Sequence, residues 1–492
     1  MKRMVLVLTA LMVVGNAVAK DDGRPTERWR GFNLLGMFVK GHSPGNFAEE
    51  EFRLVSELGF NFVRLPMDYR FWIKDGDWEQ IDEVKIAEID KAVAYGKKYN
   101  LHVQLCFHRS PGYTVAQPPE ARDLFTDADA LRVACKHWAF FAKRYKGIPS
   151  KMVSFNLFNE PGDVAEDAYA RVAGAMVAAI RAEDPSRYIV ADALKWGTLP
   201  AKELFKLGIG QATRGYTPMS VSHYLASWVG TPSEPPEWPL PPQAKSPLYG
   251  SGKAPWNVPL VVTGVPAGKL TLWPDQVSGK VTFRVTADGK TVAEREIEPR
   301  VDDPANWTNA VHRAEWNVTQ GKCLTSFSVT LPANAKRLSV EIAQGDWAGL
   351  RLITLTAPDG REAHLKFAQD WGKTNAEWRF AGFRDGFLPP EGKMDGITYL
   401  NTTVFNAFKD AVDQGVFVMV GEFGAFQHTP HAISLAWLED NLKVWKANNW
   451  GWALWNFTGS FGILDSGRKD VTYEDWNGHK LDRKMLELLL KY

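Results

Sequence analysis

Residues 154–161 read SFNLFNEP: a mostly apolar run that ends abruptly in an amide, a carboxylate and a proline. This is the pattern of a buried parallel strand whose last residues emerge into a site at its carboxyl end. Residues 416–424 read VFVMVGEFG and have the same pattern, with one carboxylate at the end of an apolar run. Glu160 and Glu422 are therefore the first candidates for chemistry.

Working outward from these two segments, strand-like and helical segments alternate along the chain, which predicts a parallel sheet with helical crossovers. Helices are expected at 47–58, 86–99, 128–145, 167–183, 400–414, 433–448 and 483–490. Strands are expected at 29–35, 59–66, 101–107, 153–158, 188–191, 219–222 (leading into residues 223–224), 416–424 and 450–455. Eight such strands predict an α/β fold of the (β/α)8 TIM-barrel type.

The alternation is interrupted between the sixth and seventh strands. A barrel allots roughly 31 residues to each strand-helix unit, so the distance from Tyr224 to Glu422 implies an insertion of roughly 165 residues. Its entrance is rich in proline, and its interior alternates polar and apolar residues with hairpin signals such as Asp288-Gly289. We expect an antiparallel β-sandwich over about 255–370. The predicted domains are a catalytic barrel at 20–228 and 396–492, with a linker and inserted module at 229–395.

The composition excludes some partners. Lys plus Arg number 58 and Asp plus Glu 57, a formal net charge of +1, which argues against a nucleic-acid or membrane partner. The three cysteines, Cys106, Cys135 and Cys323, lack the spacing of a zinc site and allow at most one disulfide. The oligomeric state is left open.

The amino terminus has the organisation of a secretory signal peptide. A basic start is followed by an apolar run over 4–14 and by small residues before Lys20, which predicts cleavage after Ala19. The run is too short to span a bilayer as a helix. We expect a secreted or periplasmic protein.

Polar, charged and aromatic residues stand at the carboxyl ends of most expected strands. In a (β/α)8 barrel these ends converge on one face, whatever their separation in sequence. Any one such residue alone is more often structural, whereas their joint occurrence points to a site. The residues are Arg64, His108, Asn159, Glu160, His223, Tyr224, Glu422 and Trp455.

These residues resemble the pattern of glycoside hydrolase family 5. The resemblance rests on the Asn-Glu-Pro element at 159–161, on Glu422 with a glycine two residues later, and on Arg64, His108 and Trp455 in the matching order. It covers roughly 29–228 and 396–490. It implies a barrel with two catalytic glutamates, after strands four and seven.

The resemblance also implies roles. Glu160 would be the general acid and base and Glu422 the nucleophile of a retaining mechanism, with carboxyl groups about 5 to 5.5 Å apart. Arg64 would favour the ionised form of Glu422, Asn159 would donate to the sugar 2-hydroxyl, and Trp455 would stack on a pyranose. The chemistry requires no cofactor or metal.

His223 and Tyr224 depart from the family pattern, in which one residue separates the sixth-strand His from the following Tyr. Neighbours on a strand point to opposite faces, so both are not expected to reach the site. Of the two substrate-binding candidates, we favour His223.

The substrate class is left open by the sequence. A secreted endo-acting β-1,4-glucanase is the default expectation, and a β-mannanase or exo-acting β-glucosidase are the alternatives within the family. A non-catalytic polysaccharide-binding protein is the alternative from another class, disfavoured because both glutamates are present. The insert either binds sugar or only shapes the cleft, and its tryptophans fit both readings: Trp273, Trp307, Trp316, Trp347, Trp371 and Trp378.

Overall fold

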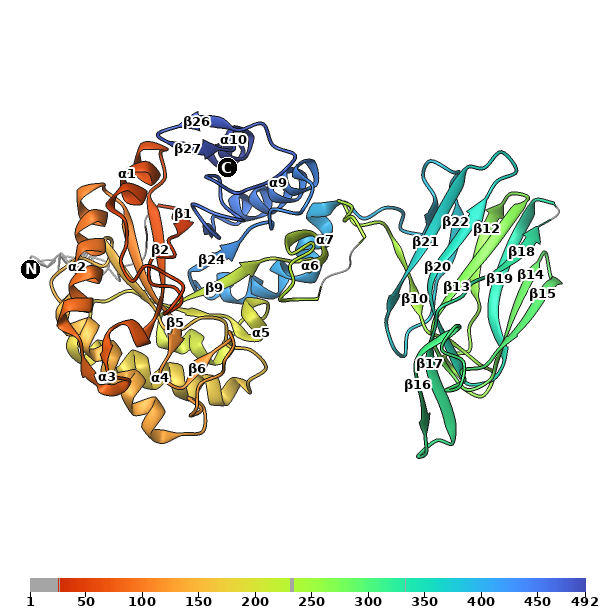
Figure 1. Cartoon of the computed structure of the whole chain (residues 1–492), viewed down its shortest axis with the longest axis horizontal. Helices are drawn as coiled ribbons and strands as arrows, with labels where there is room; N and C mark the ends of the chain where they lie inside the picture. The colour runs from red at the N-terminus through yellow and green to blue at the C-terminus, as the bar shows by residue number, and fades with distance from the viewer. Residues whose placement is uncertain (1–24, 26, 231–233, 332) are drawn as a thin grey trace, which may run out of the picture. The chain divides into compact units, whose positions relative to one another are not determined.

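The computed structural model describes residues 25, 27–230, 234–331 and 333–492. The described residues form two compact units, one from those up to residue 236 together with 400–492 and the other from those within 237–399 (Figure 1). Each unit has its own sheets and is described separately below. The predicted signal peptide at residues 1–19 lies outside the described residues.

The first unit is a closed barrel of eight parallel strands, which confirms the predicted α/β barrel. Each strand pairs with its neighbours in parallel, and pairing of β2 with β5 completes the ring. The barrel strands are β1 (Arg30–Asn33), β2 (Phe62–Asp68), β5 (His102–Ser110), β7 (Val153–Asn156), β8 (Ile189–Asp192), β9 (Gly210–Gly215), β24 (Val418–Phe423) and β25 (Gly451–Leu454).

The crossover helices follow the amphipathic segments. Aspartates cap the amino termini of three of them, because the side chains of Asp82, Asp127 and Asp482 accept hydrogen bonds from backbone N–H groups of the first turn. The principal helices are α1 (Glu49–Glu57), α2 (Glu83–Lys98), α3 (Ala128–Arg144), α4 (Glu166–Glu183), α7 (Gly396–Thr403), α9 (His431–Ala447) and α10 (Arg483–Lys491).

The sixth barrel strand is not where the sequence pattern placed it. Residues Met219–Ser222 form a short helix, α6, and the strand is β9, Gly210–Gly215. All six residues of β9 are buried although three of them are polar. Gln211, for example, exchanges two hydrogen bonds with the backbone of Ala201. Hydrophobic periodicity cannot detect a strand that is buried through polar contacts.

The second unit is a β-sandwich. One sheet has the order β10-β21-β20-β13-β17-β16, with β11 and β18 paired to it, and the other has the order β15-β14-β19-β12-β22-β23. The strands are β10 (Gln243–Ser246), β11 (Leu248–Tyr249), β12 (Leu260–Val265), β13 (Gly268–Ser278), β14 (Val281–Ala287), β15 (Lys290–Ile297), β16 (Trp307–Arg313), β17 (Val318–Cys323), β18 (Phe327–Leu331), β19 (Ala335–Gln344), β20 (Trp347–Thr356), β21 (Glu362–Gln369), β22 (Glu377–Phe380) and β23 (Phe387–Leu388).

One apolar core joins the two sheets of the sandwich. Leu270 and Leu272 of β13 meet Phe283 and Val285 of β14 in a single buried cluster. Pairing is antiparallel except for β10 with β21 and β12 with β22, which are parallel. The strands extend from 243 to 388 and so begin earlier and end later than expected.

The helix lengths and the state of the cysteines bear on the expectations about membranes and disulfides. The helices of the described residues include none long and apolar enough to cross a bilayer. Cys106, Cys135 and Cys323 are all free thiols, and Cys106 and Cys323 are buried.

Candidate active site

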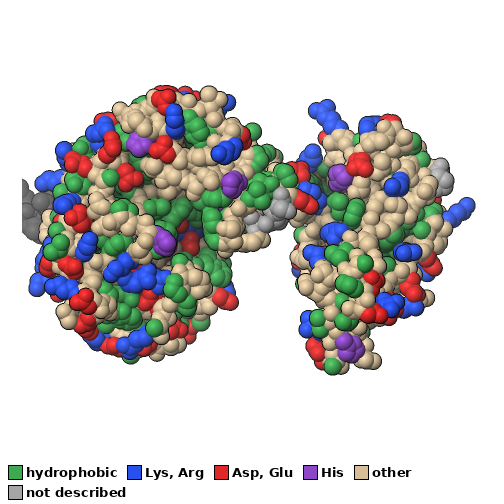
Figure 2. All heavy atoms as spheres, viewed as in Figure 1, with side chains coloured by type: hydrophobic (Ala, Val, Ile, Leu, Met, Phe, Trp, Pro, Cys, Tyr) green, Lys and Arg blue, Asp and Glu red, His purple; other side chains and the backbone are tan. Residues whose placement is uncertain are grey.

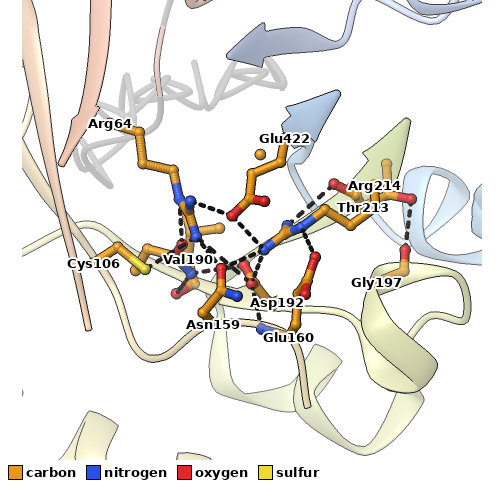
Figure 3. A network of polar contacts seen from close by, with 12 residues as sticks. Arg64, Cys106, Asn159, Glu160, Val190, Asp192, Gly197, Thr213, Arg214 and Glu422 are labelled. Atoms are coloured by element: carbon orange, nitrogen blue, oxygen red, sulfur yellow. Dashed lines mark hydrogen bonds and ion pairs between the residues drawn. The ribbon is translucent and has the colours of Figure 1, made fainter. Parts of the chain in front are cut away.

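A buried network of charged side chains lies inside the barrel and joins residues from five of its strands (Figure 3). Arg64 comes from β2, Glu160 follows β7, Asp192 ends β8, Arg214 belongs to β9 and Glu422 to β24. The barrel face is hollowed, and acidic side chains are visible inside the hollow (Figure 2). The convergence predicted from strand ends therefore includes both glutamates.

Glu422 is held by two guanidinium groups and one phenol. Its Oε1 accepts from Arg64 at 2.7 Å and from Arg214 at 3.3 Å, and Tyr216 donates to its Oε2 at 3.3 Å. The side chain of Arg64 is fully buried and that of Glu422 is 5% exposed. Charge-assisted bonds of this kind are shorter and stronger than neutral ones, so this carboxylate has a defined orientation.

Glu160 sits on a strained turn directly after its strand. Its φ is +48°, a left-handed conformation that is uncommon for a residue with a side chain. The turn is fastened on both sides, because its N–H donates to Asp192 at 2.8 Å and its carbonyl accepts from the Tyr113 hydroxyl at 2.6 Å. Its carboxylate accepts from Nε of Arg214 at 2.9 Å.

The environment raises the pKa of Glu160 to about 7. Burial is the main cause and the charge of Glu422 the second, while Arg214 opposes both. Glu160 and Glu422 thus share one arginine, and the first can hold a proton near neutral pH. Such a pairing of titratable groups is the arrangement that acid and base catalysis needs.

Asp192 and Arg214 were not among the predicted site residues. Arg214 forms an ion pair with Asp192, and Arg64 lies 3.8 Å from the same carboxylate. Burial would raise the pKa of Asp192, but Arg214 and Arg64 outweigh it and lower that pKa. Two guanidinium groups, those of Arg64 and Arg214, thus face three carboxyl groups in this network.

Asn159 has one side of its amide fixed and the other free. Its Oδ1 accepts from Arg64 and from Arg214, each at 2.9 Å, which determines the orientation of the amide. Its buried Nδ2 has no hydrogen-bond partner among the described residues. A buried donor left unpaired is costly, so this N–H group is available to a ligand.

The rings of His108, which lies in β5, and Trp455, which follows β25, form an aromatic wall. Their ring centroids are 5.8 Å apart and nearly parallel, and Phe38 packs edge-on against both. Burial and the nearby Arg64 and Arg214 lower the pKa of His108 to about 3, so the imidazole is neutral. Its Nδ1 is buried without a partner in the described residues.

His223 and Tyr224 do not end the sixth strand, contrary to the prediction. They follow α6. At the carboxyl end of β9 stands Arg214, the last residue but one of the strand, and Tyr216 comes directly after the strand. The His223 ring packs edge-on against the ring of Tyr216, the phenol that contacts Glu422, with ring centroids 4.9 Å apart. Tyr224 is the next residue and is buried.

The spacing of Arg214 and Tyr216 was the signal that could have located β9. One residue separates them, which is the separation that the family pattern requires of its sixth-strand pair. The pair does not match the family pattern by residue type, because Arg214 stands where that pattern has a histidine.

A cleft with a volume of about 650 Å³ adjoins the turn that carries Glu160. Its lining includes Tyr113, Gly162 and Trp196. Trp196 is 47% exposed, and it packs against the backbone of Gly162. An open cleft with an exposed indole is a suitable place for a sugar ring.

A closed (β/α)8 barrel with two carboxylates at the carboxyl ends of its fourth and seventh strands has the equipment that hydrolysis of a glycosidic bond requires. Residues 19–218 match the family model described as Cellulase (glycosyl hydrolase family 5). Over these residues, which include the first six strands of the barrel, the chain resembles glycoside hydrolase family 5.

Curated relatives resemble part of the barrel. The chain is 31% identical to Endoglucanase C of Acetivibrio thermocellus over 165 residues, which is 32% of this chain and 48% of that protein. It is 28% identical to Cellodextrinase A of Ruminococcus flavefaciens over 24% of this chain and 35% of the relative. The chain thus spans about half or less of the length of these relatives.

Solved structures resemble the whole chain. A glycoside hydrolase structure matches with a TM-score of 0.59 and 26% identity over 94% of this chain and 99% of that one. Cel5A of Thermotoga maritima, solved with a mannotriose substrate, matches with a TM-score of 0.50 and 15% identity over 94% and 96%. At that identity the second match supports the fold alone.

Proposed function

We propose that this protein is a secreted, retaining, endo-acting β-1,4-glucanase, with Glu422 as the nucleophile and Glu160 as the general acid and base. The observation that carries the proposal is the shared contact of both glutamates with Arg214, combined with the raised pKa of Glu160. The similarity to an endoglucanase over the barrel supports the substrate class. Export rests on the sequence of residues 1–19.

In the first step, Glu422 attacks the anomeric carbon while the bond to the leaving oxygen breaks. Both guanidinium groups occupy Oε1 of Glu422, so Oε2 beside Tyr216 is the attacking atom. Glu160 transfers its proton to the leaving oxygen. The products are a glycosyl ester on Glu422, a free chain end and an ionised Glu160.

In the second step, a water molecule attacks the ester and Glu160 takes its proton. Formation of the ester removes the negative charge of Glu422, which is one of the causes of the raised pKa of Glu160. The pKa of Glu160 therefore falls within the intermediate, but the carboxylate is held by Arg214 and remains positioned to act as a base.

Two buried polar groups without partners among the described residues are available to hold the sugar before the scissile bond. Nδ2 of Asn159 is directed by the two arginines, and the neutral His108 presents a second buried nitrogen. The face of Trp455 supplies the apolar platform. A hydrogen bond from Asn159 to the 2-hydroxyl stabilises the transition state if it strengthens as charge develops.

Product analysis tests the substrate and the mode of cleavage. Incubation with soluble β-1,4-glucan is expected to give mixed oligosaccharides and a rapid fall in viscosity, because the cleft at Tyr113 and Trp196 is open. Parallel incubations with β-mannan, xyloglucan and laminarin identify the preferred backbone. Release of glucose alone would indicate exo action, preferential cleavage of mannan would indicate a mannanase, and no cleavage at all would leave a binding protein.

The pH profile tests the role of Glu160. Since catalysis needs the protonated acid, kcat/KM on a soluble glucan is expected to fall above a pH of about 7, where Glu160 ionises. In Glu160→Gln, an activated aryl β-cellobioside that needs no protonation should retain measurable glycosylation, without this basic limb. A basic limb that is unchanged in the variant would contradict the assignment.

A further inference from the structure

The sandwich unit carries an aromatic cluster that lies outside its apolar core. The cluster consists of Tyr249, Trp256, Trp347 and Trp371. Trp371 is 55% exposed and Trp256 is 42% exposed, whereas Tyr249 is buried and forms the floor. None of the four belongs to the buried cluster that joins the two sheets. Exposed indoles grouped in this way on a folded unit indicate a binding surface.

Rigid contacts hold the rings in place. Tyr249 of β11 pairs with Trp347 of β20, and the Tyr249 hydroxyl accepts from the backbone N–H of Gly372 at 2.7 Å. Trp371 stands edge-on to Trp347 with ring centroids 4.7 Å apart, and Trp256 lies 6.0 Å from Tyr249. The platform is therefore organised without a ligand, which lowers the entropy cost of binding.

Two ion pairs flank the cluster. Lys253 and Asp346 form one at 2.9 Å, and Lys245 and Asp370 form the other at 2.8 Å. Each pair combines one cation with one anion, so the two pairs add no net charge beside the rings. They nevertheless provide hydrogen-bond donors and acceptors beside apolar faces, which matches the chemistry of a neutral pyranose.

We propose that Tyr249, Trp256, Trp347 and Trp371 form a second carbohydrate site, which binds a neutral β-glycan chain. The inference rests on the proposed function, because the chain that carries the cluster also carries a barrel proposed to cleave such polymers. Trp256 and Trp371 supply the ring faces that stack on the sugar, and Tyr249 and Trp347 support them from below. The site would increase the time that the enzyme spends on the polymer without taking part in bond cleavage.

Affinity electrophoresis of the full chain tests this site. The chain carries Glu422→Gln so that the polymer is not cut, and the gels contain hydroxyethyl cellulose, glucomannan or polygalacturonate. We expect the two neutral polymers, hydroxyethyl cellulose and glucomannan, to retard migration of the protein. The double change Trp256→Ala/Trp371→Ala should weaken the affinity of the protein for these polymers roughly tenfold or more. Polygalacturonate, which is anionic, should have no effect that depends on these tryptophans.

Trp316→Ala is the matched control, since Trp316 lies in the same unit and is 63% exposed. Its retardation should equal that of the parent, and near-ultraviolet circular dichroism verifies that each variant is folded. Equal retardation of the double variant and the parent would overturn the proposal. Binding of phospholipid vesicles or self-association through these tryptophans, in place of glycan binding, would also overturn it.

Hydrolysis of an aryl β-cellobioside by chains with Glu422 intact separates the two proposals. The tryptophan variants are expected to cleave this short substrate at the parental rate. Hydrolysis without tryptophan-dependent retardation would refute the second site and leave the proposed function standing. Tryptophan-dependent retardation without any hydrolysis by the parent would refute the function and leave the site standing.

Discussion

Glu422→Ala is expected to reduce turnover of an aryl β-cellobioside by roughly 10⁴- to 10⁶-fold, the range seen when a nucleophile is removed from an enzyme. The reason is that Oε2 of Glu422, beside Tyr216, is the only proposed attacking atom, and the two arginines would then face an empty position. Stopped assays with the purified variant measure the loss. Added azide should restore activity and yield the α-glycosyl azide, because one displacement inverts the anomeric carbon.

Glu160→Ala provides the complementary result. Azide should rescue its second step and yield the β-glycosyl azide, since Glu422 still forms the intermediate and two displacements retain the configuration. Asp184→Asn is the matched control, because Asp184 is also a buried, ion-paired carboxylate but contacts Arg187 and not the network. Exchanged azide products would reverse the two roles, and full activity of Glu422→Ala would refute the mechanism.

Arg214→Met is expected to lower the free energy of unfolding by about 3 to 5 kcal/mol, the cost of leaving buried charges without their partner. Arg214 contacts all three carboxyl groups of the network, those of Glu160, Asp192 and Glu422. Urea unfolding measures the effect. Adding Asp192→Asn should recover part of the stability, because the double variant restores the balance of charge.

The same variant should move the basic limb of the pH profile upward. Arg214 lowers the pKa of Glu160, so its removal lets burial and Glu422 raise that pKa further. Arg187→Met is the control: its side chain is also fully buried and paired, with Asp184, but lies outside the network. It should destabilise the protein without moving the limb. A limb that moves equally in both variants, or in neither, would contradict the role of Arg214.

The outline of the barrel could be predicted because its information is local. Seven of the eight strands carry apolar runs, and their alternation with helices specifies a parallel sheet. The strand Gly210–Gly215 was not predicted because its buried polar residues are satisfied by tertiary contacts: Gln211 bonds the backbone of Ala201, and Arg214 bonds carboxylates of other strands. A contact of that kind has no period along the chain. Because the sixth strand was predicted at 219–222, the residue expected at its carboxyl end was His223, whereas the strand that forms carries Arg214.

The contacts of the site residues also depend on the closed barrel more than on the local sequence. Arg64 was expected near Glu422, and the structure places it 2.7 Å away although 358 residues separate the two. Asp192 follows the expected strand 188–191 directly, and only the closed barrel shows that its carboxylate accepts the N–H of Glu160. The direction of the Asn159 amide likewise depends on two guanidiniums from different strands.

The sequence by itself determined the barrel, the interruption between its sixth and seventh strands, and the two glutamates at strand ends, because strand and helix periodicity are properties of neighbouring residues. The tertiary structure alone decided how those glutamates differ. Closure of the barrel brings two cations and three carboxyl groups into one buried volume, and the charge that each group can hold there depends on all the others.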